Sequence, residues 1–410
     1  MIALLRGIVP VFIGIVLLEL GHGLITTLVG VRMTVEQFPV SLIGVVGAAF
    51  YTGGAIGCVA AGRLIRLVGH IRAFAGFAGL FACATLMMAL IVTPAAWIVL
   101  RGLSGFCLLG LVMVAESWLN ALAVAEQRSR VLALYMIALY ASIGAGQFFL
   151  NLAPAKSFEL FAIGAMFFAG ALVPLAFMRS TSPQAPEAHP ALREIFSLSP
   201  LALVGCFASG LISGGFYTMA PVFAEMQGYE PGAIALFIAT PMAGTLILQW
   251  PIGWLSDRRG RRGVLVLTTG VLALAALAIA QDRLLSPLGV LGAALAFGGM
   301  AFVIYPLSLA HATDWSGPRR ALEISQGLLI AYSVGAALAP LLGAEAINLV
   351  GPEGLFYWFA LVATLLAAFT VVRMIQRAPV PVEQQEHFVP VPQTTPVVAE
   401  LDPRTPGPAS

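Results

Sequence analysis

The stretch GWLSDRRGRRG, residues 253–263, places five charged side chains between two long apolar runs. They are Asp257, Arg258, Arg259, Arg261 and Arg262, in a chain of 410 residues of which only 10% are charged. Each flanking run is about 20 residues long, which is the length at which an α-helix crosses roughly 30 Å of hydrocarbon. The stretch is therefore typical of a short loop between two membrane-spanning helices.

Apolar runs of this length recur along the whole chain. Hydrophobic residues make up 60% of it, and the mean hydropathy is +0.95, outside the usual range of soluble domains. Because a bilayer offers no partners to the backbone and strand-like alternation is absent, we expect helices and not a barrel. We predict an all-α integral membrane protein with twelve transmembrane helices at about residues 8–29, 41–62, 73–93, 95–121, 131–152, 159–178, 200–222, 232–252, 264–281, 287–311, 321–345 and 354–373. The first run is too long for a signal peptide and is interpreted as a retained helix.

The distribution of basic residues predicts the orientation. If the N-terminus is cytoplasmic, sixteen of the 21 arginine and lysine residues lie in the inner loops and flanks, and Arg32, Lys156 and Arg283 lie outside. The other two are Arg101, inside a span, and Arg404, in the tail. This agrees with the positive-inside rule and places both termini in the cytoplasm. The net charge of +2 gives no indication of a nucleic-acid partner. The four cysteines form no CxxC pair, so neither a disulfide framework nor a metal site is expected.

The chain divides into two halves that resemble each other. We expect a six-helix half at 1–178, a cytoplasmic linker rich in Pro, Ser and Ala at 179–199, and a second half at 200–373. The segment 374–410 carries eight prolines and is predicted to be a disordered cytoplasmic tail. An offset of 191 residues aligns Gly62 with Gly253, Gly69 with Gly260, Phe106 with Phe297, and Ser117 with Ser308. Two related halves are typical of a transporter whose binding site lies at their interface near the membrane midplane.

Several motifs carry a resemblance to a known family. The loop GWLSDRRGRR resembles the signature loop of the major facilitator superfamily, and RGLSG at 101–105 resembles its fourth-helix Arg-x-x-x-Gly motif. Residues 115–147, 249–262 and 324–340 are similar to its bacterial YcaD-like branch. The resemblance implies the major facilitator fold in the bacterial inner membrane, and a monomer without a cofactor. It also implies secondary transport of a small organic solute, driven by a proton or other ion gradient.

The chain departs from the superfamily pattern in two places. The signature Asp usually lies in the loop of the first half, where this chain has Arg66; the Asp is present only as Asp257. Residues 138–149 lack the Gly-Pro motif that is associated with drug/proton antiporters. This disfavours drug efflux without excluding it, so uptake and, as the alternative, multidrug or metabolite efflux by an antiporter both stay open.

The charged loop is interpreted as part of a gate. By the symmetry of the halves, Asp257 should meet the N-terminus of the fifth helix near Arg128 and Arg130, where a carboxylate gains about 0.3–1 kcal/mol. Glu116 should lie near the same membrane surface, with those two arginines as its partners. The alternative for Arg258, Arg261 and Arg262 is that they only set the orientation and bind anionic lipid.

Four ionisable residues stand out inside the predicted spans: Glu116, described above, and Glu19, His22 and Arg101. Glu19 lies about 16 Å along the first helix, near the midplane, and His22 follows at the i+3 spacing on the same face. The pair could share a proton and couple transport, or form a hydrogen bond that only packs the bundle. Arg101 must face a cavity or a counter-charge, for which Glu19 is one candidate.

Polar side chains elsewhere could line the cavity. Gln147, Gln249 and Tyr332 lie in the stretches most similar to the family, although such residues often merely bridge helices. A sensor or scaffold that keeps the transporter fold but has lost transport is the alternative from another class. An enzyme is not indicated, since no nucleotide-binding loop, metal-ligand set or catalytic triad is evident.

Overall fold

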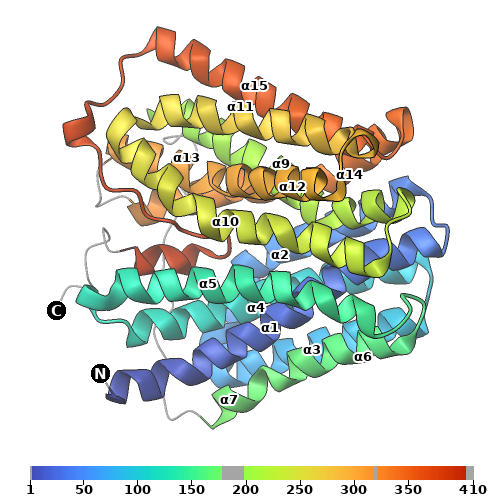
Figure 1. Ribbon diagram of the computed structural model, residues 1–410. Helices are drawn as coiled ribbons and strands as arrows, with labels where there is room; N and C mark the ends of the chain where they lie inside the picture. Colours follow the sequence, from blue (N-terminus) through green and yellow to red (C-terminus); the bar gives the residue numbers. More distant parts are fainter. Residues whose placement is uncertain (1, 178–197, 317–320, 403–410) are drawn as a thin grey trace.

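The computed structural model describes residues 2–177, 198–316 and 321–402, and all the regular elements in these ranges are helices (Figure 1). Twelve of their segments are long and apolar enough to cross a membrane, which confirms the predicted fold class. The α-helices are α1 (Ile2–Val35), α2 (Val40–Val68), α3 (His70–Leu90), α4 (Pro94–Leu122), α5 (Arg128–Gly146), α6 (Phe158–Gly170), α7 (Leu172–Ala176), α9 (Pro200–Met226), α10 (Pro231–Arg259), α11 (Arg261–Ala280), α12 (Pro287–Ala301), α13 (Ile304–Ser316), α14 (Ala321–Val350) and α15 (Gly354–Gln376). Short 3-10 helices are η1 (Ala125–Gln127), η2 (Gln147–Leu152), η3 (Asp282–Leu284), η5 (Val382–Gln384) and η6 (Pro396–Leu401). Most of the predicted linker, 179–197, lies outside the described residues.

The helices form two groups, α1–α7 and α9–α15, drawn below and above each other in Figure 1. We call the end of the bundle at which α1 begins and α15 ends the proximal end, on the left of the figure, and the other the distal end. At the distal end the groups pack closely. Gly30 of α1 faces Pro221 of α9, and Gly44 of α2 faces Pro340 of α14. Gly144 of α5 faces Met242 of α10 in the same way.

The backbone repeats at the offset read from the sequence. Gly69 and Gly260, 191 residues apart, have φ values of 82° and 84° and join α2 to α3 and α10 to α11. Side chains other than glycine rarely adopt this left-handed region, which explains the residue type at both turns. Gly53 and Gly244 are also equivalent, and each lies against the carbonyl of the neighbouring helix with no room for a Cβ. Each group therefore contains the same close helix pairing.

The prediction of a disordered tail is wrong for residues 378–402. After α15 the chain turns back at the proximal end, and η6 lies between the two groups against α4, α5 and α14 (Figure 1). The side chains of Val391, Val398 and Leu401 are almost fully buried there. Among the described residues 378–402 the regular elements are the short η5 and η6, and the valines and the leucine between the prolines supply apolar surface that packs into the bundle. Residues 403–410 lie outside the described part of the chain.

Candidate functional site: a cavity between the two helix groups

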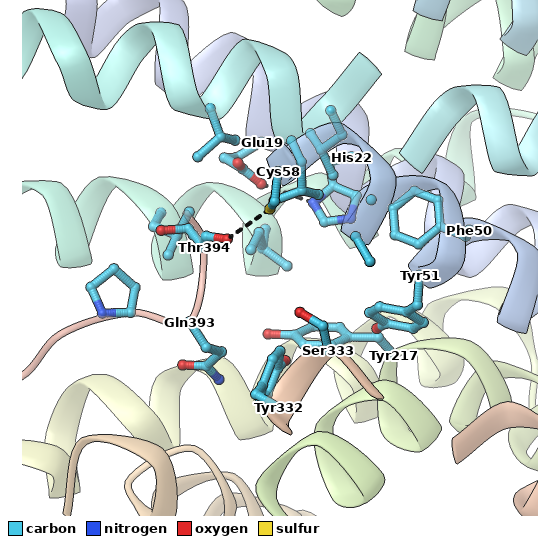
Figure 2. Close-up of a pocket in the computed structure, with 18 of the residues that line it drawn as sticks. Glu19, His22, Phe50, Tyr51, Cys58, Tyr217, Tyr332, Ser333, Gln393 and Thr394 are labelled. Carbon is cyan, nitrogen blue, oxygen red and sulfur yellow. Dashed lines mark hydrogen bonds and ion pairs between the residues drawn. The ribbon is translucent and has the colours of Figure 1, made fainter. Parts of the chain in front are cut away.

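A cavity of about 120 Å³ lies where the two groups meet (Figure 2). In Figure 2, Glu19, His22 and Cys58 lie above it, Tyr217, Tyr332 and Ser333 lie below it, and the tail enters from the left. The helices that line it are α1, α2, α4, α5, α9 and α14, so both groups contribute. Its wall is mainly apolar and aromatic with a few polar groups, which is typical of small-molecule sites.

Glu19 and His22 form a pair on the cavity wall. The Nδ1 atom of His22 lies 2.9 Å from Oε2 of Glu19, as their i, i+3 spacing on α1 allows. The Glu19 side chain is 3% exposed and that of His22 is 17% exposed, so the imidazole is the more accessible partner. The His22 ring also stacks on Phe50 of α2, with ring centroids 5.9 Å apart. The structure thus brings two predicted candidates together at the cavity.

Arg101 lies behind Phe50 and does not line the cavity. It is 2% exposed, and its guanidinium carbon lies 4.1 Å from the centroid of the Phe50 ring. Its Nε and Nη1 atoms have no hydrogen-bond partner in the described part of the chain. The suggested salt bridge to Glu19 is not formed there, and Glu19 pairs with His22 instead. Phe50 contacts both His22 and Arg101 and so connects the cavity wall to a buried cation.

The three polar candidates have different environments. Tyr332 lines the cavity, and its ring packs on Tyr305 at 5.6 Å between centroids. Gln147 accepts a hydrogen bond from the Thr27 hydroxyl and donates one to the Ile143 carbonyl at 3.0 Å, so it joins α5 to α1. Gln249 is buried in α10 away from the cavity lining, and its Nε2 has no hydrogen-bond partner among the described residues.

Glu116 is fully buried near the proximal end and accepts three hydrogen bonds from hydroxyl groups. Tyr135 donates to Oε1 at 2.8 Å, Thr394 of the tail donates to the same oxygen, and Thr395 donates to Oε2. The predicted partners Arg128 and Arg130 are replaced by these hydroxyls. The reason is helical geometry: Tyr135 lies about 10 Å further along α5 than Arg128, and the packing brings that level beside Glu116.

Asp257 also contacts the tail. It forms an ion pair with Arg261 and accepts a hydrogen bond from the Phe388 main-chain N–H at 2.9 Å. The Nδ1 atom of His387 lies 3.7 Å from its Oδ2 atom. These are its partners in the described ranges, so the predicted contact with the start of α5 is not formed here. Arg261 further contacts Asp314 at 3.2 Å and donates to the Glu386 carbonyl.

The other charged residues of the gate prediction are spread over the proximal end. Arg258 stacks on Trp254 at 4.0 Å, and Arg262 donates to the Arg377 carbonyl at 2.6 Å. Arg128 begins α5, and Arg130 is exposed. In the tail, burial raises the pKa of the Glu400 carboxyl, and the positive charge of Arg128 opposes this shift.

Sequence reasoning missed two parts of the site. Phe50 carries no sequence signal, because a single aromatic residue in an apolar helix is ordinary. Gln393 and Thr394 line the cavity from a segment assigned to disorder; the paired hydroxyls at 394 and 395 were the only indication. Within 2–177, 198–316 and 321–402, no group of three or more His, Cys, Asp or Glu side chains could hold a metal ion.

Twelve spans around a cavity lined by two helix groups are the architecture of membrane transporters for small molecules. The profile of the Major Facilitator Superfamily matches residues 11–280 and 228–404. The chain belongs to this superfamily, and the predicted resemblance is confirmed. Its relatives and fold are therefore those of transporters and not of enzymes.

The similar proteins agree with this assignment. An uncharacterised transporter of this superfamily from Enterobacter sp. (strain 638) is 28% identical over 364 residues, covering 87% of this chain and 93% of the relative. The uncharacterised transporter YcaD of Salmonella typhi is 27% identical and covers 92% of this chain and 98% of the relative. Among solved structures, the nucleoside transporter NupG has a TM-score of 0.73 at 14% identity, covering 91% of this chain and 99% of that one. The human organic anion transporter MFSD10 has a TM-score of 0.61 at 18% identity, covering 89% and 99%.

Proposed function

We propose that the chain is a secondary active transporter that moves a small organic solute by alternating access and couples this movement to protons. The observation that carries the proposal is the Glu19–His22 pair on the wall of a cavity between the two helix groups. An ionisable group inside a membrane costs about 2.5–3.5 kcal/mol on insertion scales, so such groups are functional candidates. An imidazole and a carboxylate in contact can hold one proton between them and exchange it with water in the cavity.

The packing of the two groups supports alternating access. They are in close contact at the distal end, through small residues of α1, α2 and α5, whereas the tail separates them at the proximal end. We assign residues 1–178 and 200–373 as the two moving halves and 179–199 as their linker. The arginine-rich proximal end is the cytoplasmic end by the positive-inside rule, which makes the arrangement inward-facing. The location is the bacterial inner membrane, the transporter is a monomer, and no nucleic acid is involved.

Each candidate residue then has a role. Glu19 and His22 hold the coupling proton, and Tyr332 contributes to the solute site. Arg101 supplies a fixed positive charge behind Phe50 and so positions the ring that packs on His22. Gln147 fixes α5 against α1, next to the pair. Uptake and efflux use the same site and differ only in which gradient drives the cycle.

The test is proton movement in liposomes that enclose a pH-sensitive dye. Purified protein is exposed to amino acids, sugars, organic acids and cationic drugs, and to nucleosides and organic anions, for which the two structural neighbours are named. Glu19→Gln is compared with wild type, and Glu345→Gln, an exposed residue of α14, is the matched control. We expect a solute-dependent pH change in wild type and the control that Glu19→Gln loses. Movement of labelled solute with a flat pH trace would overturn proton coupling. An unchanged pH trace in Glu19→Gln would overturn the coupling role of Glu19.

The second candidate is a sensor or scaffold that does not transport, and the tail in the cavity is the observation that favours it. A protein whose solute path is permanently filled cannot complete a cycle. Transport of any solute by the full chain excludes this candidate. Solute binding without movement, in wild type and in a variant whose tail is released, supports it.

A further inference from the structure

Residues 386–401 of the tail bind in a groove at the proximal end, between the two helix groups. On one side, Asp257 accepts from the Phe388 main-chain N–H, and Arg261 donates to the Glu386 carbonyl. On the other side, Asn120 of α4 donates to the Val397 carbonyl at 2.7 Å. The segment therefore bridges α10 and α11 of one group and α4 of the other.

The groove also contacts the side chains of the segment. Buried Glu116 receives two of its three hydroxyl donors from Thr394 and Thr395. The apolar side chains of Val391, Val397, Val398 and Leu401 are at most 4% exposed. A carboxylate deep in the bundle is thus satisfied mainly by the tail, and apolar contacts surround it.

The docked segment also reaches the solute cavity. Pro392, Gln393 and Thr394 line the cavity together with Glu19 and His22 (Figure 2). The Thr394 carbonyl lies 4.0 Å from the sulfur of Cys58 in α2, so the segment is in direct contact with the cavity wall that α2 contributes. A solute that enters from the proximal end must pass the position of these residues. Closure of that end would bring α4 towards α10, where the segment now lies.

We propose that this groove is a peptide-binding site whose ligand is the chain's own segment 386–401, and that the docked segment plugs the solute path. The ligand class is a peptide that ends in a 3-10 turn and presents two hydroxyls to one carboxylate and a main-chain N–H to another. The docked segment keeps the two helix groups apart at the proximal end and also occupies the path between them. The transport cycle therefore requires that the segment leaves the groove. The blocking role rests on the proposed transport function, whereas docking does not.

The test uses Cys58 as a reporter in the full chain. The other cysteines are replaced (Cys83→Ser, Cys107→Ala and Cys206→Ala), and the rate of maleimide labelling of Cys58 is measured in detergent. Val397→Asp with Leu401→Asp introduces two charges into the buried part of the groove and should release the segment. Val382→Asp, in an exposed part of the same tail, is the matched control.

We expect Cys58 labelling to be at least tenfold faster in the double variant and unchanged in Val382→Asp. Equal rates in wild type and the double variant would overturn docking. Phe388→Pro is measured in parallel, in case the double variant fails to fold. It removes the main-chain N–H that donates a hydrogen bond to Asp257, and Cys58 should also label faster in it. Labelling needs no solute, so it is independent of transport. Faster solute flux in the released variants supports the plug; faster labelling with unchanged flux overturns the plug and leaves only the peptide site.

Discussion

Replacing Thr394 and Thr395 together with valine should weaken the docked tail without changing the shape of its side chains. Each hydroxyl donates to Glu116, and a hydrogen bond to a charged group contributes about 1.5–3 kcal/mol. The loss of both hydrogen bonds to an ionised Glu116 costs about 3–6 kcal/mol as the sum of the two. Tyr135 still donates to Glu116 in the variant. At about 1.4 kcal/mol for each factor of ten, the ratio of docked to released tail should fall by roughly 10²–10⁴.

The assay is hydrogen exchange of the tail amides, followed by mass spectrometry of the peptide that spans residues 388–401. Exchange should accelerate across this peptide in the double variant, while peptides from α4 and α10 keep their protection. Thr364→Val is the control, because the Thr364 hydroxyl donates at 2.8 Å to the Ala360 carbonyl within α15 and does not contact the tail. Exchange of the tail peptide within twofold of wild type would refute the hydrogen-bond argument and leave apolar burial as the main source of docking.

Three further predictions concern packing and charge. Gly53→Ala should lower the midpoint of thermal unfolding, because the added Cβ would meet the Gly102 carbonyl and such overpacking costs about 1–3 kcal/mol. Gly76→Ala adds a Cβ in open space and should leave the midpoint unchanged in the same assay. Phe50→Leu removes the aromatic ring that contacts the Arg101 guanidinium, and such a contact contributes about 2 kcal/mol when it is desolvated. The variant should therefore lower the melting midpoint, whereas Phe158→Leu, which replaces an exposed ring, should leave it unchanged. Burial raises the pKa of Glu400, so the docked tail binds a proton more tightly than the released tail does. Docking should therefore be strongest at acidic pH and weaken as pH rises through that raised pKa, and the ratio of Cys58 labelling rates in wild type and Glu400→Gln should follow this dependence.

The features that were predictable from the sequence are those set within one helix. Twelve apolar runs predict twelve spans, because the bilayer fixes the length and the internal hydrogen bonding of each. The contact of Glu19 with His22 follows from helical periodicity alone. The equivalent turns at Gly69 and Gly260 follow from a repeat that leaves the same residue at the same offset.

The contacts that the sequence did not predict join distant parts of the chain. Glu116 and Thr394 are 278 residues apart, and only the folded bundle brings them together. The contact of Arg101 with Phe50 depends on which faces of α2 and α4 meet, and one sequence does not specify this. The proline content of the tail predicts how the segment behaves alone. It does not predict that the bundle contains a groove in which two carboxylates and apolar side chains bind this segment.

Asp257, at the end of α10, has two alternative partners in the proposed cycle. In this structure the Asp257 carboxylate is engaged by the Phe388 N–H, so it is not available to the N-terminus of α5. The predicted latch, worth about 0.3–1 kcal/mol, therefore can form only after the tail has left. In the proposed cycle the two interpretations of Asp257 would describe successive states: its carboxylate would anchor the tail in the inward-facing state and bind the N-terminus of α5 in the closed state. Arg261, which contacts both Asp257 and the Glu386 carbonyl, lies where such an exchange of partners would take place.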